Sequence, residues 1–257
     1  MSSSPAKPQP DLLTVSGLGF RVGGVEILRD VTLRVREGSL LGIIGPNGAG
    51  KTTFLNLVSG VLLPTSGRLE VDHHDVTKAS PATRAKLGVG RSFQTSSLFN
   101  ALSVFENARL SAQVRFGGNS RAWQRPRASD PASLAAMDAL ETVGLRTVAT
   151  SIAGTLSHGE KRKLELAILL AAEARLLLLD EPMAGVNSDD VPQLSALIAR
   201  LHHEGRTVLM VEHHMSVVVG LADRIAVFDS GRLLAVGEPD EVIANEAVQS
   251  AYLGQPL

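Results

Sequence analysis

A glycine-rich segment that directly follows an apolar run constrains this chain more than any other part of its sequence. The segment GPNGAGKTT occupies residues 45–53 and comes after LLGII at residues 40–44, a run fit for a strand buried on both faces. It opens a helix that runs toward Gly60. With this strand–loop–helix context, it matches the phosphate-binding pattern G-x-x-x-x-G-K-[ST] at Gly45, Gly50, Lys51 and Thr52.

This loop predicts a site for a nucleoside triphosphate. Glycines let successive backbone N–H groups turn toward phosphate oxygens, and the N-terminus of the following helix adds the positive end of its dipole. The Lys51 ammonium is placed to neutralise the β- and γ-phosphates, and the Thr52 hydroxyl can ligate Mg²⁺. The residues of the loop that we expect to bind the nucleotide are Gly45, Pro46, Asn47, Gly48, Ala49, Gly50, Lys51, Thr52 and Thr53.

Another apolar run ends in two carboxylates. Four leucines at residues 176–179 carry a strand through the core and leave Asp180 at its carboxyl end, where open α/β sheets bind their ligands. Asp180 is expected to act on Mg²⁺ through water. Glu181 lies one residue further along and can orient or deprotonate an attacking water.

The order of apolar segments predicts an α/β fold. Buried runs at residues 40–44, 176–179 and 207–211, with an amphipathic helix between the last two, are typical of a parallel sheet. Short β-type segments separated by glycines over residues 11–35 predict a small antiparallel sheet. Residues 99–156 contain no run of the buried-strand type, so a mainly helical insertion is expected there.

The composition limits the classes of function. Lys and Arg together number 25 against 26 for Asp and Glu, and the net charge of −1 argues against a nucleic-acid-binding protein. The absence of cysteine excludes disulfides and thiolate chemistry. No apolar run approaches the roughly 18–20 residues of a spanning helix. Residues 1–10 lack the apolar region of a signal peptide, so we expect a disordered tail on a soluble chain.

Further motifs identify a family. LSHGE at residues 156–160 resembles the LSGGQ signature of ATP-binding cassette (ABC) ATPases. Gln94 in RSFQ resembles the Q-loop, residues 184–187 (AGVN) take the place of the D-loop, and His213 in VEHHM matches the switch histidine. The resemblance covers about residues 12–254. It implies a P-loop NTPase core with a mainly parallel sheet, an N-terminal antiparallel β subdomain and an inserted α-helical subdomain.

The resemblance also implies how the chain is divided and how it works. After a tail at residues 1–10, one ABC ATPase domain would have its core in residues 11–94 and 166–257 and a helical insertion at about residues 95–165. Two such cassettes face head to tail and enclose two ATP molecules. The cofactor-binding residues Ser157 and Gly159 would then contact the γ-phosphate held by the other subunit.

Three side chains outside the loop would complete the site. The resemblance implies that Gln94 senses Mg²⁺ and the γ-phosphate, and that His213 bridges the γ-phosphate and the catalytic Glu181. ATP closes the dimer, and hydrolysis lets it open. The metal ligands expected on this basis are Thr52, Gln94 and Asp180.

Several positions depart from the family pattern. His158 and Glu160 replace a glycine and the glutamine of the signature, and we expect hydrolysis to survive both changes. The aromatic that stacks on adenine in many cassettes falls on Val22, with Phe20 two positions away; Phe20 either takes this part or is a packed strand aromatic. His214 stands where relatives often carry Asp, a change that the sequence does not explain.

The segment around AGVN and the segment after His213 resemble the ATPases of branched-chain amino acid importers. Those of urea or amide importers share much of this, and lipopolysaccharide-export ATPases are similar but less so after His213. The implied partners are transmembrane permease subunits, a second cassette (another copy or a sister ATPase) and indirectly a solute-binding protein. The location of the chain that this resemblance implies is the cytoplasmic face of the cell membrane. The permease would dock near Phe93, Leu98, Phe99 and Phe105.

Non-transport cassettes fit less well. A cassette of DNA repair would carry coiled-coil arms between the phosphate loop and LSHGE, but only about a hundred residues without sustained heptads lie there. A translation-type protein needs two cassettes in one chain, and this chain has one. No nucleic-acid partner is therefore expected.

Overall fold

The computed structural model describes residues 10–92, 98–115 and 129–252. Its strands are β1 (Asp11–Val22), β2 (Val25–Arg36), β3 (Leu40–Ile44), β4 (Ser66–Val71), β5 (His74–Asp75), β6 (Val89–Arg91), β7 (Leu176–Asp180), β8 (Thr207–Val211), β9 (Arg224–Asp229) and β10 (Arg232–Gly237). Its helices are α1 (Lys51–Ser59), α2 (Pro81–Lys86), α3 (Val104–Arg115), α4 (Pro131–Thr142), α5 (His158–Ala171), α6 (Val191–His203), α7 (Met215–Leu221), α8 (Pro239–Ile243) and α9 (Glu246–Tyr252), with 3₁₀ turns η2 (Arg146–Val148) and η3 (Ala153–Thr155).

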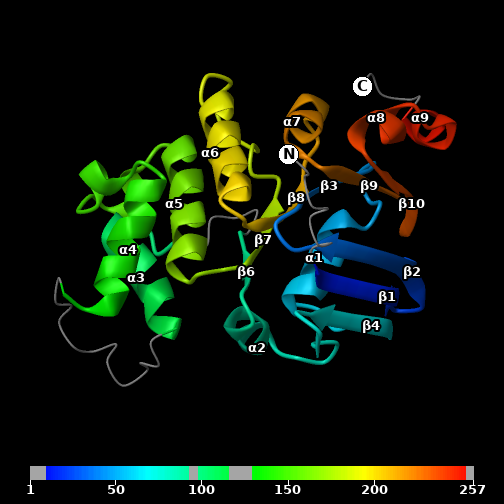
Figure 1. Cartoon of the computed structure of the whole chain (residues 1–257), viewed down its shortest axis with the longest axis horizontal. Coiled ribbons are helices and arrows are strands. Elements are labelled where there is room, and N and C mark those ends of the chain that lie inside the picture. Colours follow the sequence, from blue (N-terminus) through cyan, green and yellow to red (C-terminus); the bar gives the residue numbers. More distant parts are fainter. Residues whose placement is uncertain (1–9, 93–97, 116–128, 253–257) are drawn as a thin grey trace, which may run out of the picture.

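The strands form two sheets, as the sequence predicts (Figure 1). The N-terminal sheet has the order β2-β1-β4-β5 and is antiparallel. The larger sheet has the order β10-β9-β3-β8-β7-β6, and its strands run parallel except for the antiparallel pair β9 and β10. This arrangement confirms the predicted α/β class with an added antiparallel β subdomain.

The central strands are buried on both faces because they separate two apolar cores. Along β3, Leu41 and Ile43 face a core around α1, which also contains the inner face of the antiparallel sheet. Leu40 and Ile44 face a second core, shared with the helices α3 to α7. We call these the α1 core and the helical core. The alternation follows from the two-residue period of a strand, and it explains why LLGII is apolar throughout.

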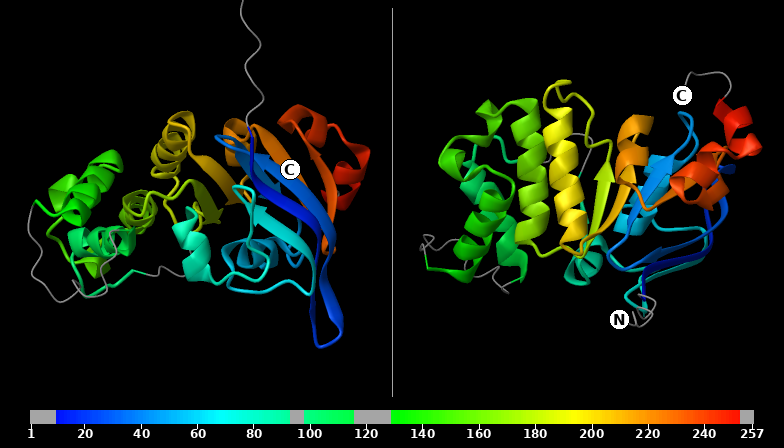
Figure 2. Two further views of the ribbon diagram at one scale, coloured as in Figure 1. Left: turned by 60° about the horizontal axis from the view of Figure 1, so that its bottom comes forward. Right: turned by 45° about the horizontal axis from the view of Figure 1, so that its top comes forward.

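The predicted helical insertion consists of α3, α4 and the turns that precede α5. Helices α3, α4 and α5 pack on one another, and they lie at the opposite end of the molecule from the β1–β2 hairpin (Figure 2). Helix α5 is continuous from residue 158 to residue 171 and also contacts α6. The predicted boundary between residues 165 and 166 therefore falls within a helix that joins the insertion to the core.

Helix α1 lies between the two sheets and ends on a buried arginine. Phe54 of α1 contacts Phe228 of β9 with ring centroids 5.3 Å apart. The guanidinium of Arg84, from α2, is fully buried and donates hydrogen bonds to the carbonyl oxygens of Leu57 and Val58 in the last turn of α1. Arg84 thus supplies a donor to the Val58 carbonyl at the helix end and a second donor to the Leu57 carbonyl, which also accepts the N–H of Gly60.

No helix in the part of the chain that the structure describes combines the length and the apolar content needed to cross a membrane. The polar tail predicted at residues 1–10 lies outside the described residues except for its last position.

Candidate active site

The phosphate loop connects β3 to α1 and has the backbone that its glycines predict. Gly45 has φ of 151°, and a Cβ atom there would lie 2.1 Å from the carbonyl oxygen of Phe228. Gly50 has φ of 99° and directly precedes α1. Both positions need glycine because a side chain would meet neighbouring atoms and the left-handed backbone disfavours other residues. The loop therefore presents its N–H groups at the N-terminus of α1.

Lys51 lies in the loop with its side chain folded over it. The Lys51 Nζ donates hydrogen bonds to the carbonyl oxygens of Gly45 at 2.6 Å and of Pro46 at 3.0 Å. Burial lowers the pKa of Lys51, and the carboxylates of Glu181 and Asp180 oppose this shift. The electrostatic contact joins the loop to the end of β7, so the structure brings the two predicted halves of the site together.

Asp180 is buried at the carboxyl end of β7. Its Oδ2 accepts a hydrogen bond from the Arg91 guanidinium at 2.9 Å, and its Oδ1 has no hydrogen-bond partner among the described residues. Burial raises the pKa of Asp180, and the hydrogen bond from Arg91 opposes this shift. Arg91 also donates to Asn56 of α1 and was not predicted from the sequence. It ends β6, a three-residue strand at the edge of the larger sheet, which is too short to leave a clear pattern.

Glu181 and His213 form a pair between the loop after β7 and the loop after β8. The Nε2 of His213 lies 2.9 Å from Oε1 of Glu181, as the family resemblance implies. The Glu181 side chain is 25% exposed and that of His213 is 43% exposed, so water can reach both. Glu181 has φ of 50° and donates its N–H to the carbonyl of Val211 in the neighbouring strand β8. The carboxylate is thereby held next to the His213 ring.

Ser157 and Gly159 lie at the start of α5, away from the phosphate loop. The Ser157 hydroxyl accepts a hydrogen bond from the N–H of Glu160, and the Glu160 carboxylate accepts one from the N–H of Ser157 at 2.8 Å. Either glutamate or glutamine can complete such a capping box, so the Glu160 departure keeps it. The S-x-x-E spacing was its readable signal. Figures 1 and 2 place α5 in the helical layer, apart from α1, so the structure does not join Ser157 to the loop of the same chain.

Replacing Ser157 by Ala is expected to destabilise the chain by about 1 kcal/mol, because the first turn of α5 loses its side-chain acceptor. Thermal unfolding should show a fall in Tm of about 2–4 °C. Ser157→Gly is the matched control, since glycine at this position costs only a few tenths of a kcal/mol. Equal Tm values for the Ala and Gly variants would contradict the capping assignment.

The structure assigns the predicted adenine contact to neither Phe20 nor Val22. Phe20 is half-buried against the α1 core, whereas Val22 is exposed near the end of β1. The register of β1 against β2 shifts by one residue between Phe20 and Arg21, and the extra residue, Ile27, lies on β2. The alternation of β1 therefore still places Phe20 and Val22 on one face. Neither residue is thereby assigned to the base.

Some predicted residues lie outside the described part of the chain. Gln94 and Phe93 are among them, so the Q-loop and part of the expected permease groove are not described. Of the remaining groove residues, Leu98 is buried, Phe105 is half-buried and Phe99 is 60% exposed. The AGVN segment of residues 184–187 lies in the turns between β7 and α6.

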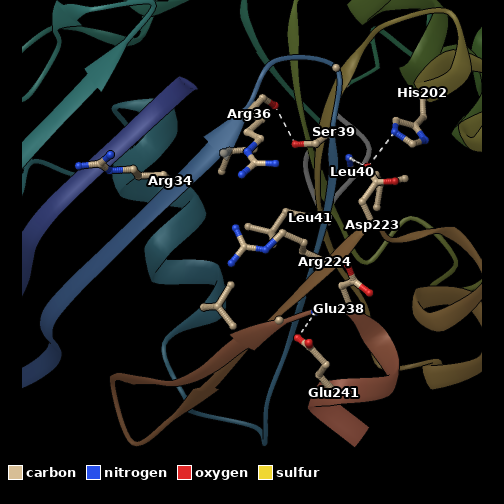
Figure 3. Close-up of a pocket in the computed structure, with 14 residues that line it drawn as sticks. Arg34, Arg36, Ser39, Leu40, Leu41, His202, Asp223, Arg224, Glu238 and Glu241 are labelled. Atoms are coloured by element: carbon tan, nitrogen blue, oxygen red, sulfur yellow. Dashed lines mark hydrogen bonds and ion pairs between the residues drawn. The ribbon is translucent and has the colours of Figure 1, made fainter. Parts of the chain in front are cut away.

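A separate hollow of about 660 Å³ lies at the amino ends of β3 and β9 in the larger sheet (Figure 3). It is lined by the start of β3 and β9 and by charged side chains that include Arg36, Arg224 and Glu241. At its rim, Oδ2 of Asp223 accepts the N–H of Leu40 and contacts Nε2 of His202 at 3.0 Å (Figure 3). None of the predicted site residues lines it.

The chain is similar to known proteins over most of its length. The family model "ABC transporter" matches residues 28–184, and the model "Branched-chain amino acid ATP-binding cassette transporter" matches residues 232–256. The high-affinity branched-chain amino acid transport ATP-binding protein LivG of Salmonella typhimurium is 38% identical over 95% of this chain and 98% of that protein. The lipopolysaccharide export system ATP-binding protein LptB of Escherichia coli is 33% identical over 95% and 97%.

A solved ATP-binding cassette of an ABC transporter, in its ADP conformation, has the same fold. It superposes with a TM-score of 0.86 at 27% identity and covers 96% of this chain and 100% of that one. The fold, the loop geometry and these similarities agree. This chain belongs to the ABC transporter family, and it is an ATP-binding cassette that hydrolyses ATP.

Proposed function

We propose that this chain is the ATPase subunit that powers uptake of branched-chain amino acids into the cell. The observation that carries the proposal is the match of residues 232–256 to the branched-chain amino acid cassette model. The similarity to LivG over nearly the whole chain supports it. Similarity to LptB makes lipopolysaccharide export the second candidate.

The residues at the end of β7 fit a magnesium ion that accompanies the nucleotide. Oδ1 of Asp180 is buried without a hydrogen-bond partner in the described residues, which leaves a carboxylate oxygen for the ion or for a water bound to it. In nucleotide sites Mg²⁺ takes one or two protein ligands together with phosphate oxygens. Thr52 and Asp180 would supply them here, with Gln94 added by the family resemblance. When bound, the ion neutralises negative charge on the β- and γ-phosphate oxygens.

The side chains of this chain then divide the work of hydrolysis. The loop N–H groups and the Lys51 ammonium bind the phosphates, and Lys51 exchanges its carbonyl partners for phosphate oxygens. Glu181 accepts a proton from the attacking water. His213 orients the Glu181 carboxylate through their 2.9 Å contact and reaches the γ-phosphate with its ring.

The proposed working unit contains more than one chain. Two cassettes face each other, so that Ser157 and Gly159 of one contact the γ-phosphate on the other; the second cassette is a copy of this chain or a sister ATPase. The exposure of Ser157 and its place away from the phosphate loop support contact between chains. Permease subunits dock on the helical insertion near Phe99, at the cytoplasmic face of the membrane, and a solute-binding protein delivers the substrate to them.

Removing this chain from its native cell is expected to abolish high-affinity uptake of radiolabelled leucine, isoleucine and valine. The wild-type chain should restore the uptake, and the Glu181→Gln variant should not, because it binds ATP without hydrolysing it. Urea uptake in the same cells is the control and should not change. Normal amino acid uptake combined with a loss of urea uptake or of lipopolysaccharide export would overturn the proposed substrate.

A further inference from the structure

A buried carboxylate lies beside the active site without any assigned function. Glu212 directly follows β8 and precedes the switch histidine His213. It is 2% exposed, although a carboxylate is costly to bury without partners. Glutamate is seldom fully buried unless it is paired, so its contacts indicate what it holds.

Both oxygens of Glu212 accept hydrogen bonds from loops that carry active-site residues. Oε1 accepts the N–H of Met183 at 2.7 Å, and Met183 lies two residues after Glu181. Oε2 accepts the N–H of His213 at 3.0 Å. One carboxylate therefore ties the loop after β7, two residues beyond Glu181, to the backbone of His213 in the loop after β8.

We propose that Glu212 is a positioning residue for ATP hydrolysis. By holding the backbone next to Glu181 and next to His213, it keeps the two side chains at the 2.9 Å separation at which the histidine can orient the carboxylate. Hydrogen bonds to a charged acceptor are stronger than those between neutral groups, which suits a link that must hold two loops. This inference rests on the proposed roles of Glu181 and His213.

His214 completes the arrangement. Its Nδ1 lies 3.1 Å from Oε2 of Glu212, and its own N–H lies 3.5 Å from the same oxygen. The His214 side chain is 60% exposed, whereas that of Glu212 is 2% exposed, so the histidine lies between the Glu212 carboxylate and the solvent. The histidine that stands where relatives often carry Asp is thus a side-chain donor to Glu212, which gives this departure a physical reason.

The test is steady-state ATP hydrolysis by the full chain carrying Glu212→Gln. Gln keeps the size of the side chain but turns one acceptor oxygen into an NH₂ group that faces an N–H donor, so one of the two loops loses its acceptor. The kcat should fall about 10- to 100-fold. The KM for ATP and the Kd for a fluorescent ATP analogue should change less than twofold, because the phosphate loop is untouched; a merely structural defect would alter binding as well.

Two further variants sharpen the test. Asp223→Asn is the matched control, because Asp223 also accepts a backbone N–H and contacts a histidine (Figure 3). It lies at the amino end of β9, away from the carboxyl ends of β7 and β8. The kcat of this variant should stay within twofold of wild type. His214→Ala removes one donor and leaves the backbone links, so it should lower kcat by about two- to tenfold. It keeps the proposal testable if Glu212→Gln does not fold.

The possible results separate this inference from the proposed site. If Glu181→Gln is inactive while Glu212→Gln and His214→Ala turn over like wild type, Glu212 has no positioning role and the site stands. If Glu181→Gln itself turns over like wild type, the proposed site is wrong. A fall in kcat for Glu212→Gln that is matched by Asp223→Asn would also overturn the inference.

Discussion

Glu181→Gln is expected to lower the kcat of ATP hydrolysis by about 10²- to 10⁴-fold, the usual contribution of a general base. The amide has nearly the shape of the carboxylate and can still contact the His213 ring, so the geometry at the end of β7 should persist. It cannot accept a proton from water at neutral pH. The affinity for ATP should be retained, because the loop N–H groups and Lys51 are unchanged.

Phosphate release under single-turnover conditions measures the chemical step directly, and a fluorescent nucleotide measures binding. Glu70→Gln is the matched control, since this carboxylate lies on β4 and pairs with Arg68 rather than with the site. Its turnover should equal that of wild type. If Glu181→Gln retained more than about a tenth of wild-type turnover, the general base would have to be a different group.

Arg84→Met is expected to give the largest loss of stability, about 3 kcal/mol. The fully buried guanidinium donates to the carbonyls of Leu57 and Val58 at the end of α1 and also to those of Ala79 and Thr77. Methionine fills similar space without a donor, so the Val58 carbonyl and the partly buried carbonyls of Thr77 and Ala79 lose the donor, at about 1–3 kcal/mol for a buried group. The Tm should fall by about 6–12 °C.

Urea unfolding followed by circular dichroism gives the free energy of unfolding for this comparison. Arg68→Met serves as the control, because Arg68 is exposed and its ion pairs with Glu70 and Asp75 lie at the surface. A surface change of this kind should stay within about 0.5 kcal/mol. If both variants lost the same free energy of unfolding, Arg84 would stabilise the chain no more than a surface arginine does and would not cap α1.

The strands could be predicted from the sequence because each carries its own pattern. LLGII and the leucines of residues 176–179 are apolar at every position, which suits only a strand between two apolar layers, and the structure has the α1 core on one side and the helical core on the other. The phosphate loop could be predicted because its binding groups are contiguous backbone N–H groups whose geometry demands particular residues.

The supporting contacts of the site could not be predicted in the same way. Arg84, Arg91 and Glu212 each bind at least one group that lies between 26 and 89 residues away in the sequence. For Arg84 and Glu212 the partners are mainly backbone groups, which are chemically alike at every position and so leave no mark in the sequence. Only folding brings such partners together. The Ser157 capping box, by contrast, spans three residues, and its spacing was readable.

The leucines of β7 stabilise the two cores, and the position of Asp180 and Glu181 depends on more than their burial. Alternate leucines of residues 176–179 face the two cores, so a strand displaced by one residue would still bury three of them, with Arg175 or Asp180 in the fourth leucine position. The same displacement would move Asp180 by about 3.3 Å along the strand. Apolar burial thus favours the observed end of the strand by one buried leucine. Polar contacts at the strand end, from Arg91 to Asp180 and from the Glu181 N–H to β8, fix the same position of the two carboxylates.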